Sequence, residues 1–287
     1  MKKKGTVYKV FKTIGLVILA CIVFIAFEIY ISANWLSVNQ FSLEASQFDE
    51  PAKLVILSDL HDHDFGESLP DKIREQQPDL ILMAGDMINE DTEKVSQIYK
   101  LISELKEIAP VYYGLGNHEE TFMEEHPSLI QELEESGCTV LDYKYEDLEI
   151  HGNAIRLGGL YDYPFGAGDC YADDASDEIK AFMKDFVSTD SFKIMIAHRP
   201  DSYVFGDSSQ VYNIDLVVSG HIHGGQVVIP FKGGLYGGDQ GWFPKYVHGL
   251  YEKGHIKMIV TSGLGTSKKK LPRFNNIPEI MVLTIGR

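Results

Sequence analysis

Two histidines stand one residue apart in the segment VVSGHIHGGQ, which covers residues 217–226. A β-branched apolar run precedes His221 and His223, and Gly224 and Gly225 follow them, so both imidazoles are expected at a turn directly after a buried strand. Neutral imidazole is a common protein ligand for metal ions. The spacing therefore favours a metal site, provided that other ligands reach the same place.

Four further segments place metal-ligating side chains directly after predicted strands: LSDLH, AGD, LGNHE and IAHRP. Each segment alone is weak evidence, because Asp after a strand is often a turn residue and a lone His is often a core residue. The carboxyl ends of adjacent strands face one crevice, so five such endings in one chain favour a shared site. The candidate residues are Asp59, His61, Asp86, Asn117, His118, His198, His221 and His223.

Strand and helix patterns alternate over the first half of the body. Short apolar runs such as KLVILSD and DLILMAGD are typical of buried strands, whereas DTEKVSQIYKLISELKEI has the period of an amphipathic helix. Strand–helix–strand alternation predicts right-handed crossovers and a largely parallel sheet. The second half is rich in strands, with one clear helix over residues 177–186. We expect an α/β fold with two packed sheets and helices outside both.

The ordered set D-x-H, G-D, G-N-H-[DE], a lone His and G-H-x-H resembles the calcineurin-like metallophosphoesterase superfamily. The tail after residue 220 is similar to the membrane-associated bacterial branch, which includes phosphodiesterases and hydrolases of nucleotide-linked lipids. The resemblance covers nearly all of residues 50–287 and implies a four-layer αββα sandwich of two mixed sheets. It also implies two metals, one held by Asp59, His61 and His223, the other by Asn117, His198 and His221, with Asp86 bridging both.

The resemblance makes His118 the catalytic residue, beside the metals rather than on them. It would stabilise the transition state or protonate the leaving oxygen. Glu119, where the family often has Asp, is the expected partner of the His118 imidazole. A metal pair supplies hydroxide at neutral pH and neutralises phosphate charge. Mixed Asp, Asn and His ligands without thiolate suit Mn, Fe, Zn or Co.

The N-terminus has the pattern of a membrane segment. Residues 14–27 contain no polar side chain, and five lysines precede them, so the positive-inside rule keeps the N-terminus in the cytoplasm. We expect a cytoplasmic tail over residues 1–12, a single-pass anchor over 13–31, a linker with an entry strand over 32–48, and an extracytoplasmic metallophosphoesterase domain over 49–287. A cleaved signal peptide and a lipoprotein are the alternatives.

Charge narrows the range of partners. Residues 1–32 contribute +4 to the net charge of −16, so the remainder carries −20, and nucleic acid is not an expected partner. No obligate protein partner is evident. The basic residues Lys268, Lys269 and Arg273 are either a solvated turn or bind a substrate phosphate or anionic headgroup. The segment LYGGDQGWFPKYVHGLY is a packed loop, a pocket wall or a membrane-facing flap, and the packed loop is slightly favoured.

These features predict a metal-dependent phosphohydrolase that cleaves phosphodiester or pyrophosphate bonds of a lipid- or envelope-linked substrate. A phosphomonoesterase on the same scaffold is the first alternative. A catalytically inactive, metal-containing binding module is the second, although the complete ligand set argues against it. Outside the membrane segment, Cys138 and Cys170 are the only cysteines, and whether they pair stays open.

Overall fold

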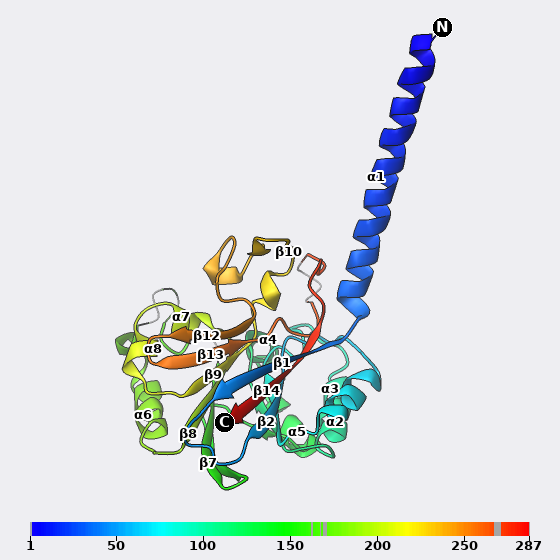
Figure 1. Cartoon of the computed structure of the whole chain (residues 1–287). Coiled ribbons are helices and arrows are strands. Elements are labelled where there is room, and N and C mark those ends of the chain that lie inside the picture. The colour runs from blue at the N-terminus through cyan, green and yellow to red at the C-terminus, as the bar shows by residue number, and fades with distance from the viewer. Residues whose placement is uncertain (1, 162, 167, 169–170, 267–270, 287) are drawn as a thin grey trace.

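Two six-stranded sheets pack face to face in the computed structural model (Figure 1), which describes residues 2–161, 163–166, 168, 171–266 and 271–286. The first sheet has the order β1 (Ser37–Glu44), β14 (Glu279–Gly286), β2 (Ala52–Leu57), β3 (Leu80–Ala84), β4 (Val111–Gly114), β5 (Thr139–Val140). The second sheet has the order β12 (Gly249–Lys253), β13 (Ile256–Val260), β9 (Leu216–Ser219), β8 (Phe192–Ala197), β7 (Asn153–Leu160), β6 (Tyr145–Ile150).

Both sheets are mixed, and their centres are parallel. Strands β2, β3, β4 and β5 run parallel, as do β7, β8, β9 and β13. Strand β14 enters the first sheet antiparallel to β2, while β6 and β12 flank the second sheet as antiparallel edge strands. The predicted two-sheet sandwich is confirmed, and its parallel centre aligns the carboxyl ends of the strands that precede the candidate ligands.

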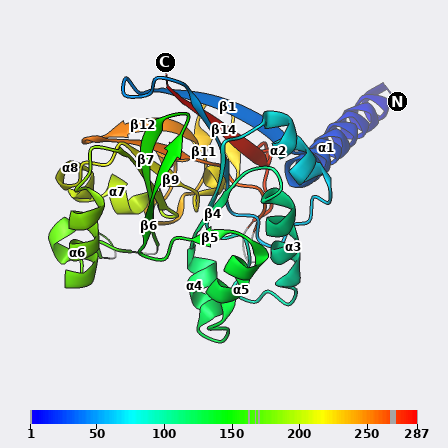
Figure 2. The ribbon, with the colours of Figure 1, turned by 90° about the horizontal axis from the view of Figure 1, so that it is seen from below.

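Helices cover both outer faces, on opposite sides of the paired sheets (Figure 2). The first sheet is covered by α2 (Ser68–Gln76), α3 (Ser96–Leu105) and α5 (Leu129–Ser136). The second is covered by α6 (Asp177–Phe186), α7 (Asp201–Val204) and α8 (Ser208–Val211). Among the described residues there are also three short 3₁₀ turns: η1 (Ala172–Asp174), η2 (His223–Gly225) and η3 (Gly238–Gln240). Helix α6 has the bounds that its sequence pattern predicts.

Strand β2 contributes to two cores because successive side chains of a strand point to opposite faces. Leu54 and Ile56 lie in the core between the sheets, whereas Val55 and Leu57 lie in the core beneath the helices. All four are fully buried, which explains why the strand is a continuous apolar run rather than an alternating one.

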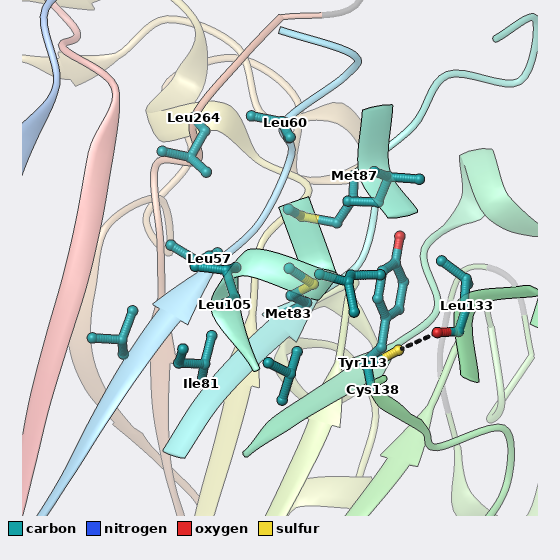
Figure 3. Close-up of a cluster of buried hydrophobic side chains, with 14 of the residues drawn as sticks. Leu57, Leu60, Ile81, Met83, Met87, Leu105, Tyr113, Leu133, Cys138 and Leu264 are labelled. Carbon is teal, nitrogen blue, oxygen red and sulfur yellow. Dashed lines mark hydrogen bonds between the residues drawn. The ribbon is translucent and has the colours of Figure 1, made fainter. Parts of the chain in front are cut away.

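Figure 3 shows part of the core beneath the helices, where Ile81 and Met83 meet Leu105. Cys138 is buried at the edge of this cluster, and its thiol donates a hydrogen bond to the Leu133 carbonyl oxygen (3.3 Å). Burial raises the pKa of the Cys138 thiol to about 12. Cys138 therefore acts as a core residue, while Cys170 lies outside the described residues.

Two element boundaries differ from their predictions. The pattern of PVYYGLGNHE predicts one strand, but β4 ends at Gly114 and a helix, α4 (Asn117–Met123), begins at Asn117. The Glu119 carboxylate accepts a hydrogen bond from the Gly116 N–H (2.8 Å) and so closes the first turn of α4. The apolar run in GQVVIP predicts a strand of several residues, but the strand there is only β10 (Val228–Ile229), paired with β11 (Gly233–Gly234).

A long N-terminal helix, α1 (Lys2–Asn34), projects from the body (Figure 1). Among the described residues it is the one helix apolar and long enough to cross a membrane, over Tyr8–Asn34, with mean hydropathy 2.8 and none of its apolar window buried against the body. Residues 32–48, predicted as a linker with an entry strand, lie largely on the body. Ser32 is fully buried, and β1 pairs along its whole length with β14.

Candidate metal centre

The five strands that precede the candidate ligands end at one edge of the sandwich. Seven of the eight candidates form three groups whose possible ligand atoms lie within 4.8 Å of one another: Asp59–His61–His223, His61–Asp86–His118, and Asp86–His198–His221. The groups share members, so they make one continuous cluster. Asn117 follows β4 at the same edge, as the first residue of α4.

Several candidate ligands have a backbone conformation that is rare outside glycine. They occupy the left-handed region at Asp59 (φ 53°), His61 (49°), Asp86 (53°), His221 (68°) and His223 (49°). Each such residue costs about 1–3 kcal/mol unless its surroundings stabilise it. Five such residues at one sheet edge indicate that the backbone there adopts a costly conformation in order to direct these side chains into the cluster.

Two glycines allow the backbone around His221 and His223 to approach the rest of the site. A Cβ atom on Gly220 would lie 2.0 Å from Ser58 Oγ and 2.4 Å from Asp59 Oδ2. A Cβ on Gly225, which has φ of 80°, would lie 2.4 Å from the Gly234 Cα atom. A side chain at Gly220 would push the histidine turn away from Asp59, and one at Gly225 would push it away from β11.

Asp86 lies at the centre of the cluster. Its Oδ1 atom accepts a hydrogen bond from the His118 backbone N–H (2.9 Å). Its Oδ2 atom lies 3.0 Å from His198 Nε2 and 3.9 Å from the Nε2 atoms of both His61 and His118. Burial raises the pKa of the Asp86 carboxyl, but the imidazoles, His198 first, outweigh burial and hold it well below its usual range. An ionised carboxylate oxygen of Asp86 thus lies close both to His61 and to His198, which belong to different ligand groups.

Neighbouring groups fix which nitrogen of His61 carries the proton. Asn89 Nδ2 donates to the His61 carbonyl oxygen (3.0 Å) and to Asp62 Oδ2 (2.7 Å), which orients Asn89 Oδ1 as an acceptor. His61 Nδ1 therefore donates to Asn89 Oδ1 (3.0 Å), and its Nε2 atom keeps a lone pair. That atom lies 3.3 Å from His223 Nε2, so a metal ion can be held between two imidazoles.

His198 is oriented in the same way. Its Nδ1 atom donates to the Ala84 carbonyl oxygen (2.7 Å), which directs Nε2 toward Asp86. Burial lowers the pKa of the His198 imidazole, but the Asp86 carboxylate outweighs burial and raises it to about 9. A proton therefore occupies the space between these side chains in the metal-free protein, and a bound cation would replace it.

Asn117 provides a direct test of whether the pocket fits a cation. Its Oδ1 atom is buried, and none of the described residues donates a hydrogen bond to it. A buried amide oxygen without a donor costs about 1–3 kcal/mol, whereas a hard cation would satisfy it. The oriented imidazoles, the carboxylates of Asp59 and Asp86 and this oxygen make a donor set that fits divalent metal ions.

His118 has a different environment from the other histidines. The Glu90 backbone N–H donates to His118 Nδ1 (3.0 Å), so the neutral imidazole carries its proton on Nε2. That N–H lies on the Asp86 side of the ring, with Nε2 3.9 Å from Asp86 Oδ2. A protonated Nε2 cannot bind a metal, so this geometry favours a hydrogen-bond donor beside the cluster.

The expected contact between Glu119 and the His118 ring is wrong. Glu119 is fully buried beneath the site. Its carboxylate accepts hydrogen bonds from the N–H groups of Gly116, Asp86, Met87 and Ile88 and from the Tyr113 hydroxyl. It thus joins the loop after β3 to the loop after β4, because both loops leave N–H groups that no strand satisfies.

Arg273 also lies elsewhere than expected. Its guanidinium is buried and donates to the carbonyl oxygens of Asn276 (3.0 Å), Gly265 (2.9 Å) and Ser262 (2.8 Å). Burial lowers the pKa of Arg273 to about 10. Arg273 therefore satisfies backbone groups instead of joining an exposed basic cluster. Lys268 and Lys269, the other residues of that cluster, lie outside the described residues.

Arg199 is a functional candidate that the sequence patterns missed. Its Nη1 atom lies 2.8 Å from His221 Nε2 and 2.9 Å from the Tyr163 hydroxyl, with Asp239 Oδ2 at 3.6 Å. The guanidinium also stacks over the Tyr163 ring, 4.4 Å from its centre. Its position next to His198 in IAHRP is the only sequence signal, and an Arg after a strand is common on protein surfaces.

A cavity of about 580 Å³ opens beside the two histidines of the GHIH turn. Its lining is mostly apolar or aromatic, and comprises His221, Ile222, His223, Gln226, Leu235, Tyr236, Gly238, Trp242 and Leu271. A reacting group at the cluster would therefore have an apolar space next to it. The segment LYGGDQGWFPKYVHGLY supplies part of that wall.

Comparisons with known proteins agree with this geometry. The family model for calcineurin-like phosphoesterases matches residues 52–225. An uncharacterized metallophosphoesterase of Helicobacter pylori is 27% identical over 236 residues, which cover 79% of this chain and 58% of that protein. The phosphodiesterase YaeI of Escherichia coli is 31% identical over 243 residues, which cover 82% of each chain.

A solved structure supports the fold alone. The sulfate thiohydrolase SoxB of Thermus thermophilus superposes with a TM-score of 0.50 at 12% identity, over 85% of this chain and 57% of that one. This chain spans 58% of the length of the Helicobacter pylori relative, so that relative has further regions of its own. The family model nevertheless covers more than half of the chain, and its matched range contains all eight candidate residues in their expected order. The chain therefore belongs to the calcineurin-like phosphoesterase family.

Proposed function

We propose that this protein is a membrane-anchored hydrolase that uses two divalent cations to cleave phosphodiester or pyrophosphate bonds of a lipid- or envelope-linked substrate. The observation that carries the proposal is the position of Asp86 Oδ2, 3.0 Å from His198 and 3.9 Å from His61, between two groups of metal-ligating side chains. A carboxylate in that position is what two adjacent cations require.

We assign the ligands of two cation positions from the family's motif pattern together with the groups around Asp86. One cation would be held by Asp59, His61 and His223, the other by Asn117, His198 and His221, with Asp86 shared. When bound, two divalent cations supply an activated water and neutralise charge on a phosphate group. The donor set suits Mn, Fe, Zn or Co.

The role of His118 follows from its tautomer. Because the Glu90 N–H occupies Nδ1, the ring carries one proton, on Nε2. A neutral imidazole is a poor acid but a good hydrogen-bond donor, so His118 would stabilise charge on a phosphate oxygen in the transition state. Of the two roles expected from the sequence, this geometry favours transition-state stabilisation over protonation of the leaving oxygen.

Two features support a substrate with an apolar part and an anionic part. The cavity of about 580 Å³ borders His221 and His223 and offers space for an acyl or prenyl group. The Arg199 guanidinium, 2.8 Å from His221 Nε2, offers a positive charge to a phosphate oxygen beside the cations.

The proposed location rests on the N-terminal helix. Lysines 2, 3, 4, 9 and 12 precede the uninterrupted apolar run of residues 14–27, which would keep residues 1–12 in the cytoplasm and the catalytic body outside. A substrate linked to a lipid or to the envelope would be reachable from that position.

Turnover of paired substrates by the full-length protein tests the proposal. With Mn²⁺ added, we expect hydrolysis of bis(p-nitrophenyl) phosphate to exceed that of p-nitrophenyl phosphate, and a long-chain diester to have a lower KM than a short-chain diester with the same leaving group. Preference for the monoester would make the protein a phosphomonoesterase. Absence of turnover with two cations bound would make it a binding module.

A further inference from the structure

Exposed aromatic side chains gather on one loop of the body, over residues 226–246. Phe231, Trp242 and Phe243 have exposed fractions of 109%, 68% and 49%, and we refer to these three side chains as the aromatic loop surface. Soluble proteins rarely expose large apolar side chains together, and such patches mark contact surfaces. The surface therefore needs a partner, and its surroundings indicate which one.

The charge of the loop differs from that of the body. Residues 226–246 carry two lysines and one aspartate, whereas the chain after residue 32 carries a net charge of −20. Lys232 Nζ lies 5.6 Å from the centre of the Phe243 ring, and Lys245 Nζ lies 4.9 Å from that of Tyr246. Aromatic rings flanked by lysines are typical of segments at a membrane interface with anionic lipids.

The aromatic loop is tied to the end of α1. Asn276 N–H donates to Ser32 Oγ (3.3 Å), while Asn276 Nδ2 donates to the carbonyl oxygens of His223 (2.7 Å) and Gln226 (3.2 Å). One residue thus connects the helix end, a candidate metal ligand and the first residue of the loop. A second cavity, of about 520 Å³, is lined both by Glu28 of α1 and by residues of the β10–β11 hairpin.

The direction of α1 determines what the loop faces. Figure 1 shows α1 leaving the body on the side from which the β10 region rises. Trp35, 61% exposed, follows directly after the apolar span, at the level where tryptophans mark a membrane–water interface. With α1 across a bilayer, the aromatic loop surface faces the same leaflet as Trp35.

We propose that the aromatic loop surface docks onto the bilayer that holds α1, so that the cavity beside His221 and His223 opens toward the lipid headgroups. The partner is a phospholipid surface with anionic headgroups. This inference rests on the membrane anchor in the proposed function, and it is independent of the reaction. Docking would present the cluster to phosphate esters that stay in the membrane.

The chain contains only two tryptophans, Trp35 and Trp242, so each can be observed alone. Full-length Trp35→Phe leaves Trp242 as the reporter, and Trp242→Phe leaves Trp35 as the internal reference. Both are reconstituted into phosphatidylcholine–phosphatidylglycerol vesicles that contain lipids brominated near the headgroup end of the chain. We expect brominated lipids to reduce the fluorescence of Trp242 to an extent comparable with Trp35.

Variants in the Trp35→Phe background test whether the loop surface causes the contact. Phe231→Ser combined with Phe243→Ser should weaken the quenching of Trp242. Val211→Ser is the matched control, because Val211 is 56% exposed but lies on α8, at the outer face of the second sheet. It should leave the quenching unchanged.

Three results would overturn the proposal. Quenching of Trp35 alone, with red-shifted Trp242 emission, would mean that the loop lies in water. Quenching of Trp35 alone, with blue-shifted Trp242 emission, would mean that a second copy of the chain covers the loop. Lack of quenching at both positions would mean that α1 is not in the bilayer. Because the readout requires no turnover, these results are separate from a failure of the proposed hydrolysis.

Discussion

For three imidazoles of the metal centre, a neighbour from another part of the chain determines which ring nitrogen carries the proton. Asn89 Oδ1 fixes it on His61, the Ala84 carbonyl fixes it on His198, and the Glu90 N–H fixes it on His118. The first two arrangements make Nε2 the atom that can bind a cation, whereas the third places an N–H on the Asp86 side of the His118 ring. Ligand and donor roles therefore follow from backbone and amide groups that bind no metal themselves.

Replacing His118 with alanine should leave the metals in place and lower kcat. Loss of one donor to a transition-state oxygen costs about 10²–10³-fold. Because the donor acts on a phosphate oxygen and not on the leaving group, the loss should be similar for nitrophenyl and alkyl diesters. Steady-state kinetics with both substrates, together with metal analysis by mass spectrometry, provides the measurement. A loss confined to the alkyl diester would make His118 a general acid instead.

Replacing Arg273 with alanine should destabilise the fold. The buried guanidinium satisfies three carbonyl oxygens, and each one left without a donor costs about 1–3 kcal/mol. Thermal unfolding of the full-length protein in detergent checks the loss, with Arg74→Ala as the control because Arg74 is exposed on α2. An unchanged melting temperature with a raised KM would restore the substrate-binding role that the sequence suggests.

The sequence predicts which residue types are ligands, but it does not predict which neighbouring groups hold those ligands in place. The order of Asp, Asn and His after predicted strands identifies the cluster, because parallel strands align their carboxyl ends. The partners of Glu119 and Arg273 depend on how separate loops meet, and no local pattern carries that information. Arg199 was missed for the same reason, since its contact with His221 joins residues 22 positions apart.

Strand β14 of the first sheet is linked to the second sheet through the buried carboxylate of Glu279. Glu279 accepts hydrogen bonds from Asn39 of β1, from His248 just before β12, and from Thr261 and Ser262 just after β13. The His248 pKa is raised by its hydrogen bond to Glu279. Burial raises the Glu279 pKa, but the bonds from His248 and its neighbours outweigh burial and lower it.

This pair predicts a dependence of stability on pH. A raised His248 pKa contributes stability that is fully present below the ordinary value of 6.5 and is lost as pH rises through the folded-state pKa. His248→Gln should therefore lower the melting temperature more at about pH 6 than at about pH 8.5. Thermal unfolding in chelator, which removes any contribution from metals, gives the comparison. An equal difference at both pH values would contradict the pairing.

The sequence predicts most elements but not how β1 and β14 join. Residues 37–44 alternate weakly and are partly polar, because β1 is an edge strand with one exposed face. A parallel partner at residues 279–286, near the other end of the described chain, cannot be inferred from such a pattern. Helix α6, by contrast, has a strong period and a serine N-cap at Ser176, and both signals are local.

In the whole molecule, the apolar helix can be removed without disturbing the body only by a cut just before Ser32. Side chains of the span are exposed, but Ser32 and Leu36 are buried against the body. Removing residues 1–31 should give a water-soluble protein that keeps its metals and its thermal stability. Size-exclusion chromatography with metal analysis checks this outcome.

Removing residues 1–44 provides the contrast, because it also deletes β1 and exposes the edge of β14. An unpaired edge strand promotes association, so this shorter protein should aggregate. If the protein lacking residues 1–31 aggregates as well, α1 is part of the fold and its role as a separate anchor is wrong.

The proposed hydrolysis of phosphoesters depends on Asp86 holding two cations together. Metal content and turnover of bis(p-nitrophenyl) phosphate, measured on the same samples of wild type and Asp86→Ala, test it most directly. We expect two divalent ions per chain in the active wild-type protein and loss of both metals and turnover in Asp86→Ala, whereas the control Asp71→Ala, which removes an exposed carboxylate on α2, should keep them. An Asp86→Ala variant that still binds two ions per chain, or a wild-type protein that is fully active with one ion, would contradict the bridging role of Asp86.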